Sequence, residues 1–222
     1  MIITKQKPFE EILRSLEGEQ SVFLVGCELC ATLCQTGGEE QVKEMKEKLE
    51  AAGKEATGWV VLDPACHILE AKKELRKRKE EVGRASSLLV MACGVGTQAI
   101  EEATGKIVHP ACNTLFLGAT QRFGHFEEYC SLCGECVLDL TGGICPVTRC
   151  AKGLLNGPCG GAKNGKCEVD PERDCAWLLI YERLKEIGGL DNLRSMPPQV
   201  KDYSKARKPA RLILEHKEVA GQ

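Results

Sequence analysis

Cysteine is the feature that most limits how this chain can fold. The sequence of 222 residues holds 14 cysteines, and eight of them fall between Cys130 and Cys175. That is far more than packing requires, so these thiols are expected to bind metal, form disulfides or carry out redox chemistry. The N-terminal stretch has scattered charges and lacks the apolar segment of a signal peptide. We therefore expect a cytoplasmic, reducing environment, which favours metal ligation over disulfides.

Composition excludes two other classes of function. The net charge of −2 removes the basic footprint that binding to a nucleic-acid backbone requires. The longest apolar runs, Leu88 to Cys93 and Trp177 to Tyr181, fall far short of the roughly 20 residues that cross a bilayer. We expect neither nucleic acid nor membrane as a partner.

Residues 1–128 show the pattern of an α/β domain. Short apolar runs alternate with charged segments of helical periodicity, which indicates a doubly wound parallel sheet covered on both faces. The expected strands are 21–27, 58–63 and 87–93, and the expected helices are 39–53 and 68–83. A helix over 96–104 and short strands near Ile107 and 114–117 would complete the domain.

Residues 129–195 follow a different pattern, rich in Cys, Gly and Pro and without a run that could form a core alone. We expect a small Cys-rich metal-cluster domain, because metal binding supplies folding free energy where apolar burial is scarce. A C-terminal helix begins after Cys175 and ends at Gly188 and Gly189. Residues 196–222 form an extended basic tail, either a solvated arm or a segment that docks on a partner; its cations are Lys201, Lys205, Arg207, Lys208, Arg211 and Lys217.

The first cysteine motif is Cys27-x2-Cys30-x3-Cys34, at the end of the first predicted strand of the sheet. Such a loop offers three thiolates to a cubane cluster and leaves the fourth position to another segment. Cys93 ends a strand that lies beside that of Cys27 in a flavodoxin-like order, so we predict one site from Cys27, Cys30, Cys34 and Cys93. Cys66 and Cys112 also follow strands and are the alternatives for the fourth ligand, although a lone cysteine is more often a small buried apolar residue.

The second group of cysteines opens with Cys130-x2-Cys133-x2-Cys136 and continues with Cys145-Pro146. This partly matches the bacterial ferredoxin motif, although the Cys-Pro pair comes later than it does there. Paired Cys-x2-Cys knuckles also occur in zinc ribbons, so zinc in place of one cluster stays open. We predict two four-thiolate centres, one from Cys130, Cys133, Cys136 and Cys175 and the other from Cys145, Cys150, Cys159 and Cys167.

Other chemistry has little support in the sequence. The four histidines, at positions 67, 109, 125 and 216, lack paired metal-binding spacing, and we predict structural roles for them. The glycine-rich stretches match neither a dinucleotide-binding nor a phosphate-binding motif. We therefore predict no organic-cofactor site and no catalytic residue on this chain.

The cysteine segments together resemble a known family. Residues 130–184, together with GCELCATLCQTGG at 26–38, resemble the C-terminal-domain family of methylenetetrahydrofolate reductase, and the resemblance extends from about residue 10 to residue 190. In acetogenic and related bacteria this family is the small zinc or iron–sulfur subunit that partners the flavin-binding reductase.

The resemblance implies an electron-transfer subunit rather than a catalytic one. The chain would hold two or three [4Fe–4S] clusters, accept electrons from an upstream donor protein and pass them to the FMN of the reductase, which reduces methylenetetrahydrofolate to methyltetrahydrofolate. The alternative is a zinc-binding scaffold or regulatory subunit that docks on the reductase. An independent oxidoreductase with its own organic cofactor is a third possibility.

Overall fold

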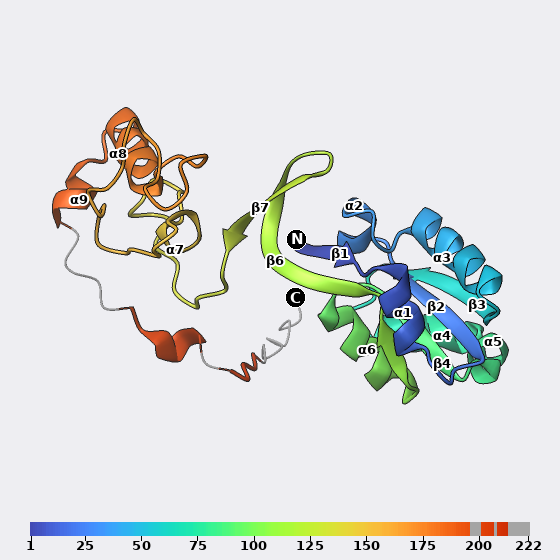
Figure 1. Ribbon diagram of the computed structural model, residues 1–222. Coiled ribbons are helices and arrows are strands. Elements are labelled where there is room, and N and C mark those ends of the chain that lie inside the picture. Colours follow the sequence, from blue (N-terminus) through green and yellow to red (C-terminus); the bar gives the residue numbers. More distant parts are fainter. Residues whose placement is uncertain (196–200, 207, 213–222) are drawn as a thin grey trace, which may run out of the picture. The chain divides into compact units, whose positions relative to one another are not determined.

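The computed structural model describes residues 1–195, 201–206 and 208–212. The chain forms two compact units, Met1–Glu128 and Tyr129–Gln222 (Figure 1). The boundary between the units falls where the density of cysteines rises.

The first unit alternates strands and helices. Its strands are β1 (Ile2–Gln6), β2 (Ser21–Cys27), β3 (Glu55–Leu62), β4 (Ser87–Met91), β5 (Val108–Pro110), β6 (Cys112–Arg122) and β7 (His125–Cys130), the last of which reaches across the boundary. Its helices are α1 (Phe9–Ser15), α2 (Cys30–Leu33), α3 (Glu39–Ala51), α4 (Ile68–Lys77), α5 (Lys79–Arg84) and α6 (Gly94–Thr104).

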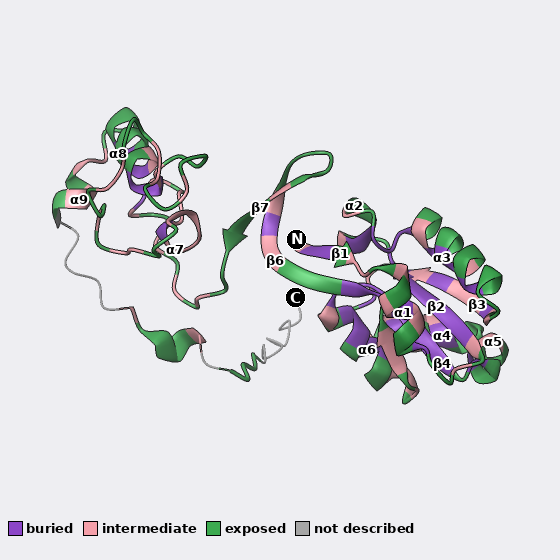
Figure 2. Cartoon of the chain, in the orientation of Figure 1, coloured by how far each residue is buried: buried purple, intermediate pink, exposed green. Residues whose placement is uncertain are grey.

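A four-stranded parallel sheet lies at the centre of this unit, in the order β3-β2-β4-β5. Successive residues of β2 enter two different cores: Val22 and Leu24 pack with α1 and α3, and Phe23 and Val25 pack with α4, α5 and α6. Figure 2 shows β2 and β4 as largely buried. The predicted parallel sheet with helices on both faces is confirmed, and so is the adjacency of β2 and β4.

The helices follow the predicted pattern with one interruption. Helix α3 buries Val42, Met45 and Leu49 at helical spacing, which is the amphipathic face that its sequence indicates. The segment predicted as one helix over 68–83 is two helices, α4 and α5, which meet at Arg78. Both still bury an apolar face against the same core.

A second, antiparallel sheet in the order β1-β6-β7 was not predicted. The segment 114–117, expected to extend the parallel sheet, instead lies in β6 and pairs with β1. Residues 113–115 are exposed, unlike a strand of a parallel sheet, which is buried on both faces. Only the short strand β5 continues the parallel sheet beyond β4.

The second unit has little regular structure among its described residues. It contains the helices α7 (Pro146–Arg149), α8 (Ala176–Glu186) and α9 (Asp191–Ser195) and the 3-10 helix η1 (Tyr203–Ala206). Its buried apolar cluster is small and centres on Trp177, Ile180 and Leu184 of α8. Of the predicted tail at 196–222, residues 201–206 and 208–212 are described and the others lie outside the described residues. No described helix has the length and apolar character that a membrane span requires.

Candidate metal centres

Cysteines of the first unit gather at the carboxyl edge of the parallel sheet. Cys27 is the last residue of β2, Cys93 is the residue just before α6 and follows β4, and Cys66 lies in the turn between β3 and α4. Parallel strands end at the same edge, and β2 lies between β3 and β4. The strand order therefore places Cys27 between Cys66 and Cys93.

The short helix α2 carries the next two cysteines of the first motif. Cys30 begins this helix and Cys34 follows its last residue. Both sulfurs hydrogen-bond to the same residue of β1, Ile2. The Ile2 N–H donates to Cys30 Sγ at 3.4 Å, whereas Cys34 Sγ donates to the Ile2 carbonyl at 3.9 Å. The antiparallel sheet thus supplies contacts to the loop that carries the motif.

The pKa of Cys66 is affected by the other thiols at this edge of the sheet. Partial burial of its sulfur raises the pKa of Cys66, and the thiolates of Cys27, Cys93 and Cys30 raise that pKa further. The residue as a whole is exposed. Like charges that oppose one another in this way are relieved when a metal centre binds the thiolates.

Cys112 has the properties of a structural thiol. It is buried at the start of β6 and donates from Sγ to the Thr36 carbonyl at 3.5 Å. Burial raises its pKa to about 12, so it remains protonated at neutral pH. Of the two alternatives for a fourth ligand, the structure therefore favours Cys66.

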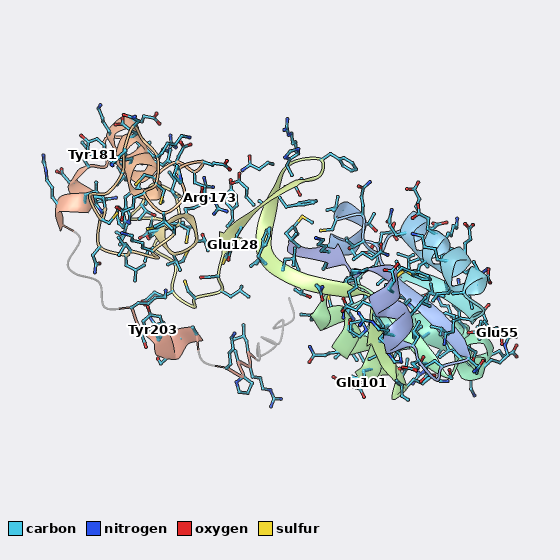
Figure 3. All side chains as sticks on the ribbon, in the orientation of Figure 1. Glu55, Glu101, Glu128, Arg173, Tyr181 and Tyr203 are labelled. Carbon is cyan, nitrogen blue, oxygen red and sulfur yellow. The ribbon has the colours of Figure 1, made fainter. Side chains whose placement is uncertain are left out.

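Four cysteines of the second unit line one small cavity next to the start of α8: Cys150, Cys159, Cys167 and Cys175. The cavity is also lined by Lys152, Glu168 and Trp177. Lys152 forms an ion pair with Glu168, whose Oε1 also accepts from Cys159 Sγ at 3.6 Å. Figure 3 shows sulfur atoms among these loops, between the labelled Arg173 and Tyr181.

This grouping differs from the one that spacing suggested, which combined Cys175 with the opening motif. A tight turn explains the difference. Arg173 N donates to the Asp170 carbonyl at 3.0 Å, and Cys167 N donates to the Arg173 carbonyl at 2.9 Å. The chain after the turn therefore runs back along the chain before it and returns Cys175 to the side of Cys167.

The remaining four cysteines are Cys130, Cys133, Cys136 and Cys145. Cys145 is the residue just before α7, and this helix contacts the residue before Cys130. Thr148 Oγ1 donates to the Tyr129 carbonyl at 3.2 Å, and the Arg149 guanidinium lies 5.1 Å from the centre of the Tyr129 ring. These contacts hold α7 against the start of the Cys-x2-Cys-x2-Cys loop.

The described part of the tail packs on that loop. Lys205 Nζ pairs with Glu135 Oε1 at 2.6 Å, and Lys201 Nζ donates to the Glu135 carbonyl at 3.4 Å. A hydrogen bond from Lys201 lowers the pKa of the Cys133 thiol, which favours the thiolate form. In Figure 3, Tyr203 marks η1, which belongs to this segment. Residues 201–206 are therefore part of the structure around the loop and not a fully solvated arm.

Gly134 allows this close approach. Its φ is +78°, and a Cβ there would overlap the backbone carbonyl of Lys205. We expect Gly134→Ala to release residues 201–206, because the obstacle is backbone and cannot rotate away. Trypsin cleavage after Lys201 and Lys205 should become at least about 10-fold faster, since cleavage follows the population of the open form.

Gly143→Ala is the matched control for this prediction. Gly143 also has a left-handed φ, +87°, but no atom lies within 4 Å of its Cβ position. Both variants thus carry a similar conformational cost. Equal cleavage rates for the two variants would show that the clash at Gly134 does not control the segment.

Cys150, Cys159, Cys167 and Cys175 line a cavity rather than meet at one point. Among the described residues, no three Cys, His, Asp or Glu side chains converge closely enough to hold one metal ion. A four-iron cluster separates its four thiolate ligands by the size of the cluster itself, so its ligands do not meet at a point. The donor chemistry of the four-cysteine sets, soft thiolates without histidine, fits such a cluster.

Two described histidines have structural surroundings. His67 caps α4, where its Nδ1 accepts from the Glu70 N–H at 3.2 Å. His109 lies in β5, 4.0 Å from Glu19, and burial lowers its pKa. His125 lies in β7, and His216 lies outside the described residues.

The fold and the cysteine groups define a class of protein: a parallel α/β unit with thiols at its carboxyl edge, followed by a cysteine-rich unit with a very small apolar core. Residues 109–204 match the model of the family described as methylene-tetrahydrofolate reductase C terminal. The resemblance inferred from the cysteine motifs is confirmed over this range, which includes all eight cysteines from Cys130 to Cys175. Residues 26–38 lie outside the match. No curated protein and no solved structure matches the chain.

Proposed function

We propose that this protein is an iron–sulfur electron-transfer subunit of a methylenetetrahydrofolate reductase complex. It would receive electrons from a donor protein and pass them to the FMN of a flavin-binding catalytic partner, which reduces methylenetetrahydrofolate to methyltetrahydrofolate. The observation that carries the proposal is the family match over residues 109–204, because the matched region includes both four-cysteine groups of the second unit.

The cysteines would hold the clusters and tune them rather than act as nucleophiles. Bound clusters would supply one-electron redox chemistry. The positive charge of Lys201 beside Cys133 would offset the negative charge of the thiolates of the opening motif. Such charges near a cluster make reduction easier.

Exposed apolar side chains support a docking role for the carboxyl edge of the sheet. Leu29 and Leu33 flank Cys30, Val95 follows Cys93 by two residues, and all three are exposed. Leu69, three residues after Cys66, is exposed as well. Apolar patches with a polar surround are typical of surfaces that bind another protein. A redox partner that docks here would approach the cysteines closely.

The first test is the metal content of the full chain purified without oxygen. We expect at least eight irons per chain with a matching amount of acid-labile sulfide, and an EPR signal at low temperature after reduction. Zinc without sulfide would contradict the electron-transfer role and favour the zinc-binding scaffold. A flavin absorbance on the isolated chain would instead favour an independent oxidoreductase.

The second test addresses the partner. The reduced protein should transfer electrons to the FMN of a methylenetetrahydrofolate reductase catalytic subunit, observed as bleaching of the flavin absorbance under anoxic conditions. The control is the same protein after its metal has been removed. Equal bleaching with and without metal would contradict the proposed route of the electrons.

A further inference from the structure

A pocket of about 390 Å³ lies between the described part of the tail and the loop of the opening cysteine motif. This volume is within the range of pockets that bind small molecules in proteins. Its lining combines two lysines, Lys201 and Lys208, with apolar side chains. None of the described residues that line it is an aspartate or a glutamate. The pocket therefore offers positive charge beside an apolar surface.

The tail segment that forms one side of the pocket is held in place, and one of the two lysines already has a role there. Lys205 pairs with Glu135 at 2.6 Å, which fixes the segment on the loop. Lys201 Nζ and Cys133 Sγ both donate to the Glu135 carbonyl, each at 3.4 Å. The Lys201 ammonium thus lies beside Cys133, where it offsets the negative charge of a thiolate.

Lys208 is the cation that remains for a ligand. It is exposed and lines the pocket. No carboxylate of the residues that the structure describes pairs with Lys208, whereas Lys205 of the same segment pairs with Glu135. An unpaired ammonium at the edge of an apolar pocket is complementary to one carboxylate or phosphate group.

Two exposed side chains form the apolar surface beside Lys208. Leu132 has a φ of +56°, a left-handed conformation that is unfavourable for a residue with a Cβ. Its side chain is nevertheless 72% exposed, so burial within this chain does not offset that cost. Tyr203 also lines the pocket and is 74% exposed. Strained residues are frequent at ligand sites, and the Tyr203 ring offers a stacking surface to a planar ligand.

We infer that this pocket binds a small molecule that carries an anionic group, a carboxylate or a phosphate, on a planar aromatic body. Lys208 would pair with the anionic group, and Leu132 and Tyr203 would contact the ring. The inference rests on the proposed function for the choice between two sources of this chemistry. One is the folate, whose aminobenzoyl ring carries glutamate carboxylates, and the other is FMN, whose flavin ring carries a phosphate.

The test is isothermal titration calorimetry of the full chain, purified without oxygen with its metal and freed of small molecules by gel filtration. Two pairs of probes distinguish the sources: 4-aminobenzoylglutamate with its uncharged diamide, and FMN with riboflavin, which lacks the phosphate. We expect the anionic member of at least one pair to bind at least about 10-fold more tightly than its uncharged analogue.

Three variants assign the affinity to the pocket. Lys208→Met should weaken binding of the anion about 10-fold and leave binding of the uncharged analogue unchanged. The matched control is Lys163→Met, which removes the same charge at an exposed position of the same unit outside the pocket and should bind as the wild type does. Leu132→Gly removes the apolar contact at a backbone conformation that glycine adopts readily. It should weaken binding of both members of the pair without loss of iron.

The outcomes separate this site from the proposed function. Tighter binding of 4-aminobenzoylglutamate would identify the folate as the source, and tighter binding of FMN the flavin. Absence of binding in a chain with its full iron content, equal affinities for the anion and its analogue, or equal effects of Lys208→Met and Lys163→Met would overturn the site and leave the electron-transfer role standing. A wild-type chain without iron would instead contradict the proposed function itself.

Discussion

Gly37→Ala is expected to destabilise the first unit by at least about 3 kcal/mol, the upper end of the usual range for an overpacked site. Gly37 is buried in the loop between α2 and α3, and a Cβ there would overlap the carbonyl oxygen of Met91, the last residue of β4. That obstacle is backbone inside a parallel sheet, where Met91 pairs with Gly26. Only a shift of the loop or of the strand could relieve the overlap.

The same loop is tied to the cysteines. Cys27 N donates to the Gly37 carbonyl at 2.9 Å, so a shift of Gly37 would disturb the backbone at the end of β2. Because stabilities of whole domains are about 5–15 kcal/mol, the substitution should remove a large part of the stability of this unit. We expect it to reduce metal retention at the carboxyl edge as well.

Each unit contains one tryptophan, which allows the two unfolding transitions to be followed separately. Trp59 lies in β3 and Trp177 in α8. In a Trp177→Phe background, urea unfolding monitored by fluorescence reports the first unit. The matched control is Gly83→Ala, at an exposed helical position with no atom within 4 Å of the Cβ, where alanine should be neutral or stabilising by up to about 1 kcal/mol. A free energy of unfolding for Gly37→Ala equal to that of the control would contradict the prediction.

The parallel sheet was predictable because its information is local. The runs SVFLVGC and SLLVMAC are apolar throughout, as strands buried on both faces must be, and charged helical segments separate the runs. The antiparallel sheet was not predictable from such patterns. Strand β1 contains Lys5, is followed directly by Lys7, and pairs with β6 more than 100 residues away. The Met1 amino group just before β1 donates to the Gly118 carbonyl. No periodicity in either segment specifies its partner.

The cysteines illustrate the same limit at the candidate sites. Spacing along the chain identified the thiol-rich loops, but the hydrogen-bond partners that distinguish Cys30 from Cys34 come from β1. The return of Cys175 to Cys167 did have a local signal: the Asp170-Pro171 pair is typical of a turn, and Asp170 Oδ1 accepts from Glu172 N at 3.2 Å. This turn is what brings Cys175 back beside Cys167.

Removal of metal is expected to unfold the second unit and leave the first folded. The second unit buries only one small apolar cluster, around Trp177, and burial of one such side chain contributes about 1.5–3 kcal/mol. Fixing the backbone costs about 1–2 kcal/mol per residue, so this cluster cannot by itself order the loops from Cys130 to Cys175. Metal binding to thiolates contributes on the order of 10 kcal/mol per structural site, which is several times what burial of any one of these side chains contributes.

Hydrogen exchange of the full chain, followed by mass spectrometry before and after anoxic chelation, tests this expectation. Amides of residues 130–186 should lose nearly all protection when the metal is removed. Amides of β2 and β4 should keep theirs, because both core clusters of the first unit form from apolar side chains. The first unit thus serves as the internal control within the same molecule. Persistent protection around α8 in the chelated chain would mean that the Trp177 cluster is sufficient, and the cysteines would then be ligands that the fold does not require.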